Sequence, residues 1–341
     1  MTTLQLSYAQ RIAAMARTKL EHNRGKLLQN GYHDTDDHGC IPWSEPIPFE
    51  RISNHPDGGS YGIRCIGENF RRWLEVHPIY INPYSSLAGA WIRTLPEMGG
   101  WRPEDRPEHL YPLHKKYQIV SSGIGAPNHF GPDMRIGLDL GFGGLLNKIH
   151  YYRAFNQPAS TDFYDGEENL LLGVQTWIRK HVESARQLAN AEPEPDLREN
   201  LLQMADCNAW LVENPPRTFR EACQFLGWFQ VIDRMWGLGG GLGQLDELLR
   251  PYYERDRQAG RLSDEEAIWH LASLFINDTH YSQVGGPAPD GHDLTSPLSF
   301  LILEATHRLK IPMDLAVRVH DGLDPILLRK AVEYTLQDGT G

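Results

Sequence analysis

Cysteine is scarce in this sequence, with four residues in 341, at positions 40, 65, 207 and 223. None of them forms a CxxC pair, and their number is far below the density of a small secreted protein held together by disulfides. We therefore expect a reducing, cytoplasmic setting in which the thiols are buried as small apolar side chains.

Long hydrophobic runs are also absent. No stretch approaches the about 18 apolar residues that cross a bilayer, and residues 1–14 lack the basic start and apolar core of a signal peptide. Basic residues are outnumbered, 33 Lys and Arg against 44 Asp and Glu, which gives a net charge of -11. We expect neither a membrane nor a nucleic acid as the main partner, because nucleic-acid binders concentrate basic residues on one face.

The remaining composition is that of a globular protein, with 40% hydrophobic and 23% charged residues. Apolar spacing predicts a helix over residues 5–30 that ends at Gly31. Prolines and glycines predict irregular chain over 31–62 and a surface segment over 95–114. Residues 133–210 read as mainly helical, with an acidic connector at 191–195.

The last third of the chain alternates strand and helix signals. Capping boxes begin helices at Thr218 and at Ser263, each with a Glu three residues later. Residues 313–320 alternate apolar and polar side chains, as a strand does, and Asp324-Pro325 then begins a helix that ends near Gly339. A strand followed directly by a helix indicates a parallel α/β sheet. The sequence stops where the next strand would follow, so we expect the sheet to continue in another segment or chain.

Few segments carry the residue types of a catalytic or metal site. Residues 32–40 contain His, Asp and Cys side chains, but neighbouring loop residues diverge and the spacing matches no common ligand pattern, so a solvated turn is the simpler interpretation. The glycine-rich segment 237–243 lacks the Gly-Lys-Ser/Thr ending of a phosphate-binding loop and follows a helical pattern, which favours a close approach of backbone.

Three side chains are candidates for a substrate site. His129 and Asp133 place an imidazole and a carboxylate where a helix begins, and a carboxylate is stabilised there by the helix dipole. From the residues alone, a structural role for His129 is slightly favoured over a catalytic one. Asp246 falls within a helical pattern, where an exposed carboxylate is the default interpretation.

Several motifs resemble those of glycyl radical enzymes related to pyruvate formate-lyase. Residues 214–225 read NPPRTFREACQF, similar to the family's P-P-x-T-F-x-E-A-x-Q-x helix. The resemblance continues in order through the segments 251–256, 260–267, 284–295 and 315–320, and residues 128–133 are similar to the family's G-H-x-x-P-D segment. It thins before residue 118. We accordingly divide the chain into a helical and irregular region, 1–118, and a pyruvate formate-lyase-like half-barrel domain with helices, 119–341.

The resemblance implies a helical N-terminal region plus the first half of a ten-stranded α/β barrel. In that family a glycyl radical, installed by a radical-SAM activase, oxidises a cysteine on a loop inside the barrel. The thiyl radical then abstracts hydrogen from a small-molecule substrate and starts C–C or C–heteroatom cleavage or dehydration. No bound cofactor is expected. The barrel interior must be dry, because water and oxygen would divert the radical.

The sequence departs from the family pattern at decisive places. The G-C-x-E cysteine loop and the R-V-x-G-[YFW] radical loop are absent from residues 1–341. We therefore expect no catalytic residue in this chain and a partner, the C-terminal half or a separate subunit, that carries both loops. The resemblance also implies an oligomer. Cys207 and Cys223 lie on amphipathic helices and are expected in the core.

The resemblance assigns roles to the three candidates by position. His129 is the best substrate-facing group, Asp133 supports it, and Asp246 retains a family Asp that is expected to fix a loop. Leu238 and Gly239 stand where many dehydratases have a His-Ser pair, and residues 243–247, GQLDE, replace G-R-F-D-Q. These changes remove polar contacts and place a polyol substrate in doubt.

Two alternatives to a radical lyase or dehydratase remain open. A catalytically silent scaffold or regulatory paralogue would lose the cysteine, glycine and His-Ser positions as a group. A metal-dependent enzyme would use the ligand types between His33 and Cys40.

Overall fold

The computed structural model describes residues 6–31, 41–96, 101–118, 131–236, 240–277 and 281–339. Most of these residues are helical. The helices are α1 (Tyr8–Asn30), α2 (Ile63–Val76), α3 (Tyr111–Lys116), α4 (Met134–Asn156), α5 (Asp162–Ala191), α6 (Pro195–Leu211), α7 (Phe219–Met235), α8 (Leu245–Gln258), α9 (Asp264–Asn277), α10 (Pro297–Leu309) and α11 (Pro325–Asp338). The strands are β1 (Gly243–Gln244), β2 (Ser282–Val284) and β3 (Leu315–Val317).

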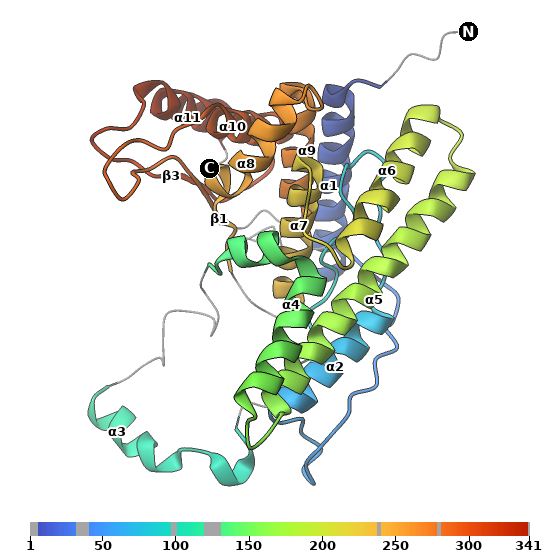
Figure 1. The fold of residues 1–341 in the computed structure, drawn as a ribbon, viewed down its shortest axis with the longest axis vertical. Helices are drawn as coiled ribbons and strands as arrows, with labels where there is room; N and C mark the ends of the chain where they lie inside the picture. Colours follow the sequence, from blue (N-terminus) through green and yellow to red (C-terminus); the bar gives the residue numbers. More distant parts are fainter. Residues whose placement is uncertain are drawn as a thin grey trace.

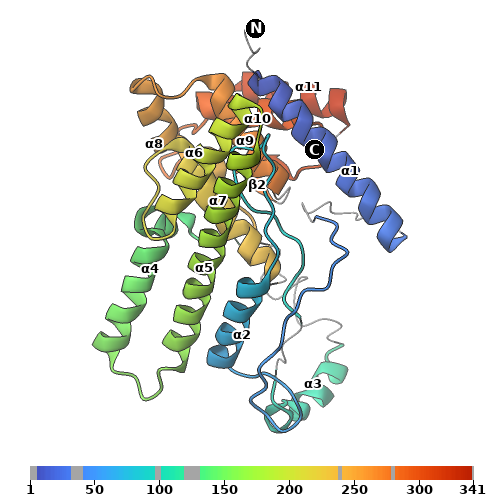
Figure 2. The same ribbon diagram turned by 90° about the vertical axis from the view of Figure 1, so that its right-hand side faces the viewer.

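The elements gather into two parts (Figure 1). Helices α2, α4 and α5 lie alongside one another and extend away from the sheet, whereas α8 to α11 surround the strands. Helix α1 packs against α9 and α10, although most of the sequence separates them (Figure 2). Among the described residues, no helix has both the length and the apolar character needed to cross a bilayer.

The three strands form one parallel sheet in the order β1-β2-β3. Gly243 pairs with Ser282, and Ser282 pairs with Leu315. Helices connect successive strands, because two parallel strands cannot be joined by a tight turn. Within the described ranges, neither β1 nor β3 pairs with a further strand. The parallel α/β sheet is thus confirmed, with a strand at residues 315–317 that is shorter than the predicted 313–320.

Helix ends follow the local signals in the sequence. Ser7 and Gln10 form a capping box at the start of α1, and Gly31 ends that helix in the left-handed conformation. The capping box predicted at Thr218 is present, and Asp324 caps α11 through its side chain. The connector between α5 and α6 lies at the predicted 191–195. Residues 41–62 contain no helix or strand, as predicted, whereas residues 103–116 form short helical turns and α3 on the surface.

The hydrophobic core is centred on α7. Phe219, Phe225 and Trp228 of this helix are completely buried, and the same core includes Ile12 of α1 and Trp177 of α5. Trp228 packs edge-on against Trp177, with ring centroids 5.0 Å apart. The core therefore includes side chains from both sides of residue 118, and the proposed domain boundary there stays a prediction.

Helix α4 is kinked at Gly141, whose φ of 63° lies in the left-handed region. A Cβ at this position would lie 2.4 Å from the carbonyl carbon of Asn214, so space as well as conformation requires glycine. The kink brings the backbone N–H of Gly143 within 3.0 Å of the Glu213 carbonyl oxygen, to which it donates a hydrogen bond. The turn before α7 and the middle of α4 are thereby tied together.

Helices α2 and α5 approach through two glycines. A Cβ on Gly67 would lie 2.3 Å from the carbonyl oxygen of Gly166, a distance that requires the backbone to move. Gly227 of α7 is different, since its Cβ would meet a Leu274 methyl at 3.5 Å, an ordinary contact.

Gly67 and Gly227 provide a matched test of stability, because only the first lies against the backbone of another helix. We expect Gly67→Ala to lower the free energy of unfolding by about 1–3 kcal/mol, because it overpacks a backbone contact. Gly227→Ala should leave it unchanged or raise it by up to about 1 kcal/mol, because alanine favours the helix. Urea titration followed by circular dichroism measures both. Equal effects of the two substitutions would contradict the close approach of α2 and α5.

Candidate active site

The carboxyl ends of the three parallel strands meet at one edge of the sheet, where open α/β folds bind ligands. Gln244 is the last residue of β1, and Gly285 and Arg318 directly follow β2 and β3. The Gln244 side-chain amide donates to the Gly285 carbonyl oxygen at 2.7 Å and accepts from the Arg318 guanidinium at 2.9 Å. One glutamine therefore links the ends of all three strands.

The loop after β2 depends on consecutive glycines. Gly285 and Gly286 have φ values of 66° and 95°, a region that other residues rarely adopt. A Cβ on Gly286 would lie 2.9 Å from the Cβ of Arg318. The loop and the residue that follows β3 can pack this closely only because the side chain is missing.

Asp246 holds the same loop in place through hydrogen bonds. It is 0% exposed. Its Oδ2 accepts hydrogen bonds from the Gly285 backbone N–H at 2.8 Å and from the Ser299 hydroxyl, and its Oδ1 accepts from the Glu247 N–H at 3.0 Å. Burial raises the pKa of this carboxyl group, and the hydrogen bonds partly offset that rise. The default interpretation of an exposed helical carboxylate is wrong, because the partners that bury Asp246 come from the loop after β2 and from α10.

A cleft of about 520 Å³ opens beside this network. One wall is residues 131–135, at the start of α4, and the other is formed by Leu242, Gly243, Gln244, Glu247 and Leu248. Asp133, predicted from the sequence, is therefore in the cleft wall with Gln244. The carboxyl group of Asp246 belongs to the supporting network, and Asp246 does not line the cleft. His129 lies outside the described residues, as do Leu238 and Gly239.

Asp133 has its own partner at the mouth of the cleft. It caps α4 by accepting the Arg135 backbone N–H at 3.1 Å, and it forms an ion pair with the Arg135 guanidinium at 2.9 Å. Arg135 holds the pKa of this exposed carboxyl group below its usual value. Asp133 is therefore ionised at neutral pH, and both of its carboxylate oxygens accept hydrogen bonds from Arg135.

Sequence reasoning missed three polar residues here: Gln244, Glu247 and Arg318. Glu247 lines the cleft, contacts Arg250, and has a pKa that burial raises. Gln244 and Glu247 both lie in the 243–247 segment that the family comparison already marks. Their position within that segment was the signal that could have identified them.

The side chains of Asp293 and His320 hold the loop after β3 against the loop after β2. His320 Nε2 lies 3.0 Å from Asp293 Oδ1, and the other carboxylate oxygen accepts the Asp324 backbone N–H at 3.0 Å. Residues 285–295 are thereby joined to the start of α11. Both oxygens of Asp293 are thus engaged in holding the two loops together.

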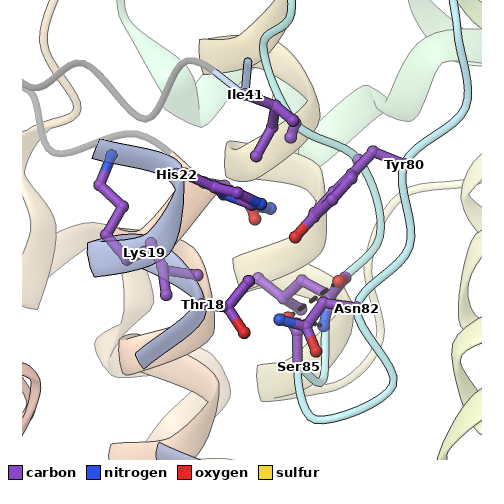
Figure 3. Close-up of a pocket in the computed structure, with 12 residues that line it drawn as sticks. Thr18, Lys19, His22, Ile41, Tyr80, Asn82 and Ser85 are labelled. Carbon is purple, nitrogen blue, oxygen red and sulfur yellow. Dashed lines mark hydrogen bonds between the residues drawn. The ribbon is translucent and has the colours of Figure 1, made fainter. Parts of the chain in front are cut away.

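Another cavity, near α1, is too small for a substrate (Figure 3). His22 and Tyr80 face each other across it, with ring centroids 5.8 Å apart. Its volume of about 20 Å³ is comparable to the space that a single water molecule needs, about 10–15 Å³. Burial raises the pKa of Tyr80 to about 12, so its hydroxyl stays protonated. The larger cleft at the sheet edge is the better candidate for a substrate site.

The described residues show neither a cluster of metal ligands nor a reactive thiol at Cys207 or Cys223. No group of three His, Cys, Asp or Glu side chains converges among those residues, and the predicted cluster between His33 and Cys40 lies outside them. Cys207 and Cys223 are buried, as predicted. Burial raises the pKa of Cys207 to about 12 and also raises that of Cys223. Both thiols are therefore protonated and unreactive as nucleophiles.

The role of Asp246 can be tested by substitution. We expect Asp246→Asn to lower the free energy of unfolding by about 1–3 kcal/mol, because the amide places a donor against a backbone N–H that loses its acceptor. Asp133→Asn should change it by less than about 0.5 kcal/mol, since the site is exposed and Asn caps a helix as well as Asp. Thermal and urea unfolding measure both. An unaltered stability of Asp246→Asn would contradict the fastening role.

The amino-acid sequence of this chain is similar to those of several known proteins. A sequence profile of the pyruvate formate lyase-like family matches residues 118–341. The isethionate sulfite-lyase of Nitratidesulfovibrio vulgaris is 30% identical over 190 residues, 48% of this chain and 23% of that protein. The Escherichia coli K12 protein named "Probable dehydratase YbiW" is 27% identical over 276 residues, 68% of this chain and 34% of that protein. The chain thus aligns with 23% and 34% of the length of these two curated relatives.

Solved structures share the fold over nearly the whole chain. The glycerol-bound B12-independent glycerol dehydratase from Clostridium butyricum has a TM-score of 0.73 at 16% identity, covering 99% of this chain and 50% of that one. A glycyl radical enzyme from Archaeoglobus fulgidus has a TM-score of 0.71 at 19% identity, with coverage of 96% and 50%. The predicted half-barrel fold is confirmed, and the match over residues 118–341 shows that this chain belongs to the pyruvate formate lyase-like family.

Proposed function

We propose that this chain is the N-terminal part or subunit of a glycyl radical lyase or dehydratase. The cysteine whose thiyl radical abstracts hydrogen from the substrate, and the glycine that stores the radical, would lie outside residues 1–341, in a C-terminal half or a separate subunit. The names of the relatives support this class: they include a sulfite-lyase, a dehydratase and the glycyl radical subunit of a 4-hydroxyphenylacetate decarboxylase from Clostridioides difficile.

The observation that carries the proposal is the exposed apolar face at the end of the sheet. Helix α11 packs inward through the fully buried Leu327, but it exposes Val332 by 50% and Leu336 by 81% on the opposite side. Val319, just after β3, is also exposed. Within the described ranges β3 has a partner strand on one side only. Such a face with an adjoining strand edge favours a tight complement, and the second half of a barrel would supply one.

In this arrangement, the chain's own residues hold and shape one wall of the substrate cavity. Asp246 and Gln244 keep the loop after β2 in place, and the Asp133–Arg135 pair stands at the entrance. His129 remains our candidate for a substrate-facing group, with Asp133 near it in sequence. The radical-bearing partner, once activated by a radical-SAM enzyme, would supply hydrogen abstraction. Closing the cavity against the partner would exclude water.

The substrate is expected to carry fewer hydroxyl groups than a polyol. By family resemblance, Leu238 and Gly239 stand where many dehydratases have a His-Ser pair, so these two positions offer fewer side-chain hydrogen bonds. A cavity that lacks those partners would leave the hydroxyl groups of a polyol unsatisfied, which costs binding energy.

The direct test is anaerobic native purification followed by mass spectrometry of the intact assembly. We expect one equivalent of a polypeptide segment with a G-C-x-E loop and an R-V-x-G-[YFW] loop, and a glycyl radical signal in electron paramagnetic resonance after activation. A monomeric chain that unfolds cooperatively, binds no apolar dye and has no such companion would contradict the proposal. It would leave the silent scaffold or regulatory paralogue as the function.

A substitution on the exposed apolar face of α11 tests whether this face binds the partner. We expect Leu336→Glu to weaken association with the radical-bearing partner at least 10-fold, because each buried Leu contributes about 1.5–3 kcal/mol and about 1.4 kcal/mol is a factor of ten. Leu28→Glu, on α1, changes a residue that is 86% exposed and serves as the matched control. Titration by analytical ultracentrifugation measures both. Equal affinities for the two variants would show that α11 lies outside the interface.

A further inference from the structure

Two buried histidines lie between the end of α2 and the middle of α5. His77 directly follows α2 and is 1% exposed, and His181 of α5 is completely buried. Both imidazole rings pack edge-on against the indole of Trp177, with ring centroids 5.6 Å and 4.6 Å away. Trp73 contacts His77 at 5.1 Å, and Trp228 contacts His181 at 4.8 Å. The two imidazoles therefore belong to one aromatic cluster, built from α2, α5 and α7.

The ring nitrogens of this histidine pair have few hydrogen-bond partners. His181 Nδ1 donates to the Trp177 carbonyl oxygen at 2.9 Å, whereas its Nε2 has no partner in the described part of the chain. For His77, neither ring nitrogen has a partner among the described residues. An imidazolium carries two N–H donors and needs an acceptor for each. Because the cluster offers His77 none, a positive charge on this ring would be buried without compensation.

The charged group nearest the histidine pair also opposes a positive charge. The Lys180 ammonium of α5 lies close enough to act on both rings, and Glu75 of α2 turns its half-exposed carboxylate to Arg71, at 3.0 Å. Helix α7 contributes the neutral Trp228, whose indole donates to the Asn208 amide oxygen of α6 at 2.6 Å. No carboxylate among the described residues pairs with either imidazole. Neutral rings are thus the only form that this cluster accommodates well.

The same place is where α5 holds the end of α2. The Lys180 ammonium donates to the Glu75 carbonyl oxygen, and the Trp177 indole N–H donates to the Pro78 carbonyl oxygen at 3.4 Å. Both acceptors lie within two residues of His77. A change of charge on His77 therefore acts directly on the junction between the two helices.

We propose that His77 and His181 form an acid-sensitive switch that holds α2 against α5 only while both imidazoles are neutral. Two phenyl rings would fill the same space with no unpaired nitrogen, so the imidazoles differ from them chiefly in their response to acid. Opening would separate α2 and α5, which lie in the part of the molecule that extends away from the sheet (Figures 1 and 2). The proposal does not depend on radical chemistry.

The direction of the response follows from the two states. Burial lowers the pKa of His77 to about 3 and that of His181 to about 4. In the open or unfolded chain a histidine has a pKa of about 6.5. The stability that the neutral pair provides is therefore present above about pH 6.5 and is lost as the pH falls toward the folded-state values.

Urea unfolding of the full 341-residue chain at pH 7 and at pH 5 tests the switch. Between these two pH values the unfolding equilibrium constant of the unaltered protein should rise about 20-fold more than that of His77→Phe, because one proton is bound only after unfolding. His181→Phe should show a similar difference, and the double variant should show the product, about 400-fold. His109→Phe changes an exposed histidine and should follow the unaltered protein.

Two further measurements locate the effect. In nuclear magnetic resonance spectra of the unaltered protein, which need no variant to fold, the ring signals of His77 and His181 should keep their neutral positions from pH 8 to pH 5. Hydrogen exchange at pH 5 should be faster in the unaltered protein than in the double variant at α2 and the middle of α5, and equal at α9.

Three results would each overturn the proposal. The first is a His77 ring signal that moves with a midpoint near pH 6.5 in the folded protein. The second is an equal pH dependence of the unaltered protein and His77→Phe. The third is faster exchange spread evenly over all helices, which would show acid unfolding of the whole chain without a switch between α2 and α5.

Discussion

The burial of α7 on almost every side is the constraint on which the rest of the structure depends. A polar side chain on such a helix must find a partner inside the protein, because water cannot reach it. Gln224 meets this demand by accepting the Ala88 N–H at 2.7 Å and donating to the Ala88 carbonyl oxygen at 3.1 Å. Gln230 donates to the carbonyl oxygen of Gly240 at 2.9 Å. The same helix therefore positions an N-terminal segment and the approach to β1.

Features that depend on neighbours in sequence could be predicted. Capping side chains such as Ser7 and Thr218 act within three residues, and Gly31 ends its helix by its own conformation. The general α/β class also followed, because a strand and a helix signal lay side by side near residue 320. The strand lengths did not follow, since a ladder of two or three residues is set by tertiary packing more than by an alternating pattern.

Features that depend on distant partners could not be predicted. Asp246 is buried because Gly285 and Ser299, 39 and 53 residues away, donate to it. The cleft requires the start of α4 to meet residues 242–248, more than a hundred positions further along the chain. Family resemblance marked Asp246 as a residue that fixes a loop, but it could not name Gly285 and Ser299 as the groups that Asp246 holds.

The paired glycines after β2 bear on how this scaffold can diversify. A side chain at Gly286 would collide with Arg318, and Gly285 is held by Asp246, so almost any single replacement there carries a folding penalty. The facing segment, residues 131–135, is secured at the surface by the Asp133–Arg135 pair. Substitutions would therefore accumulate in residues 131–135 and would be removed by selection at Gly285 and Gly286. Changes in the shape and charge of the cleft should therefore arise mainly at the start of α4.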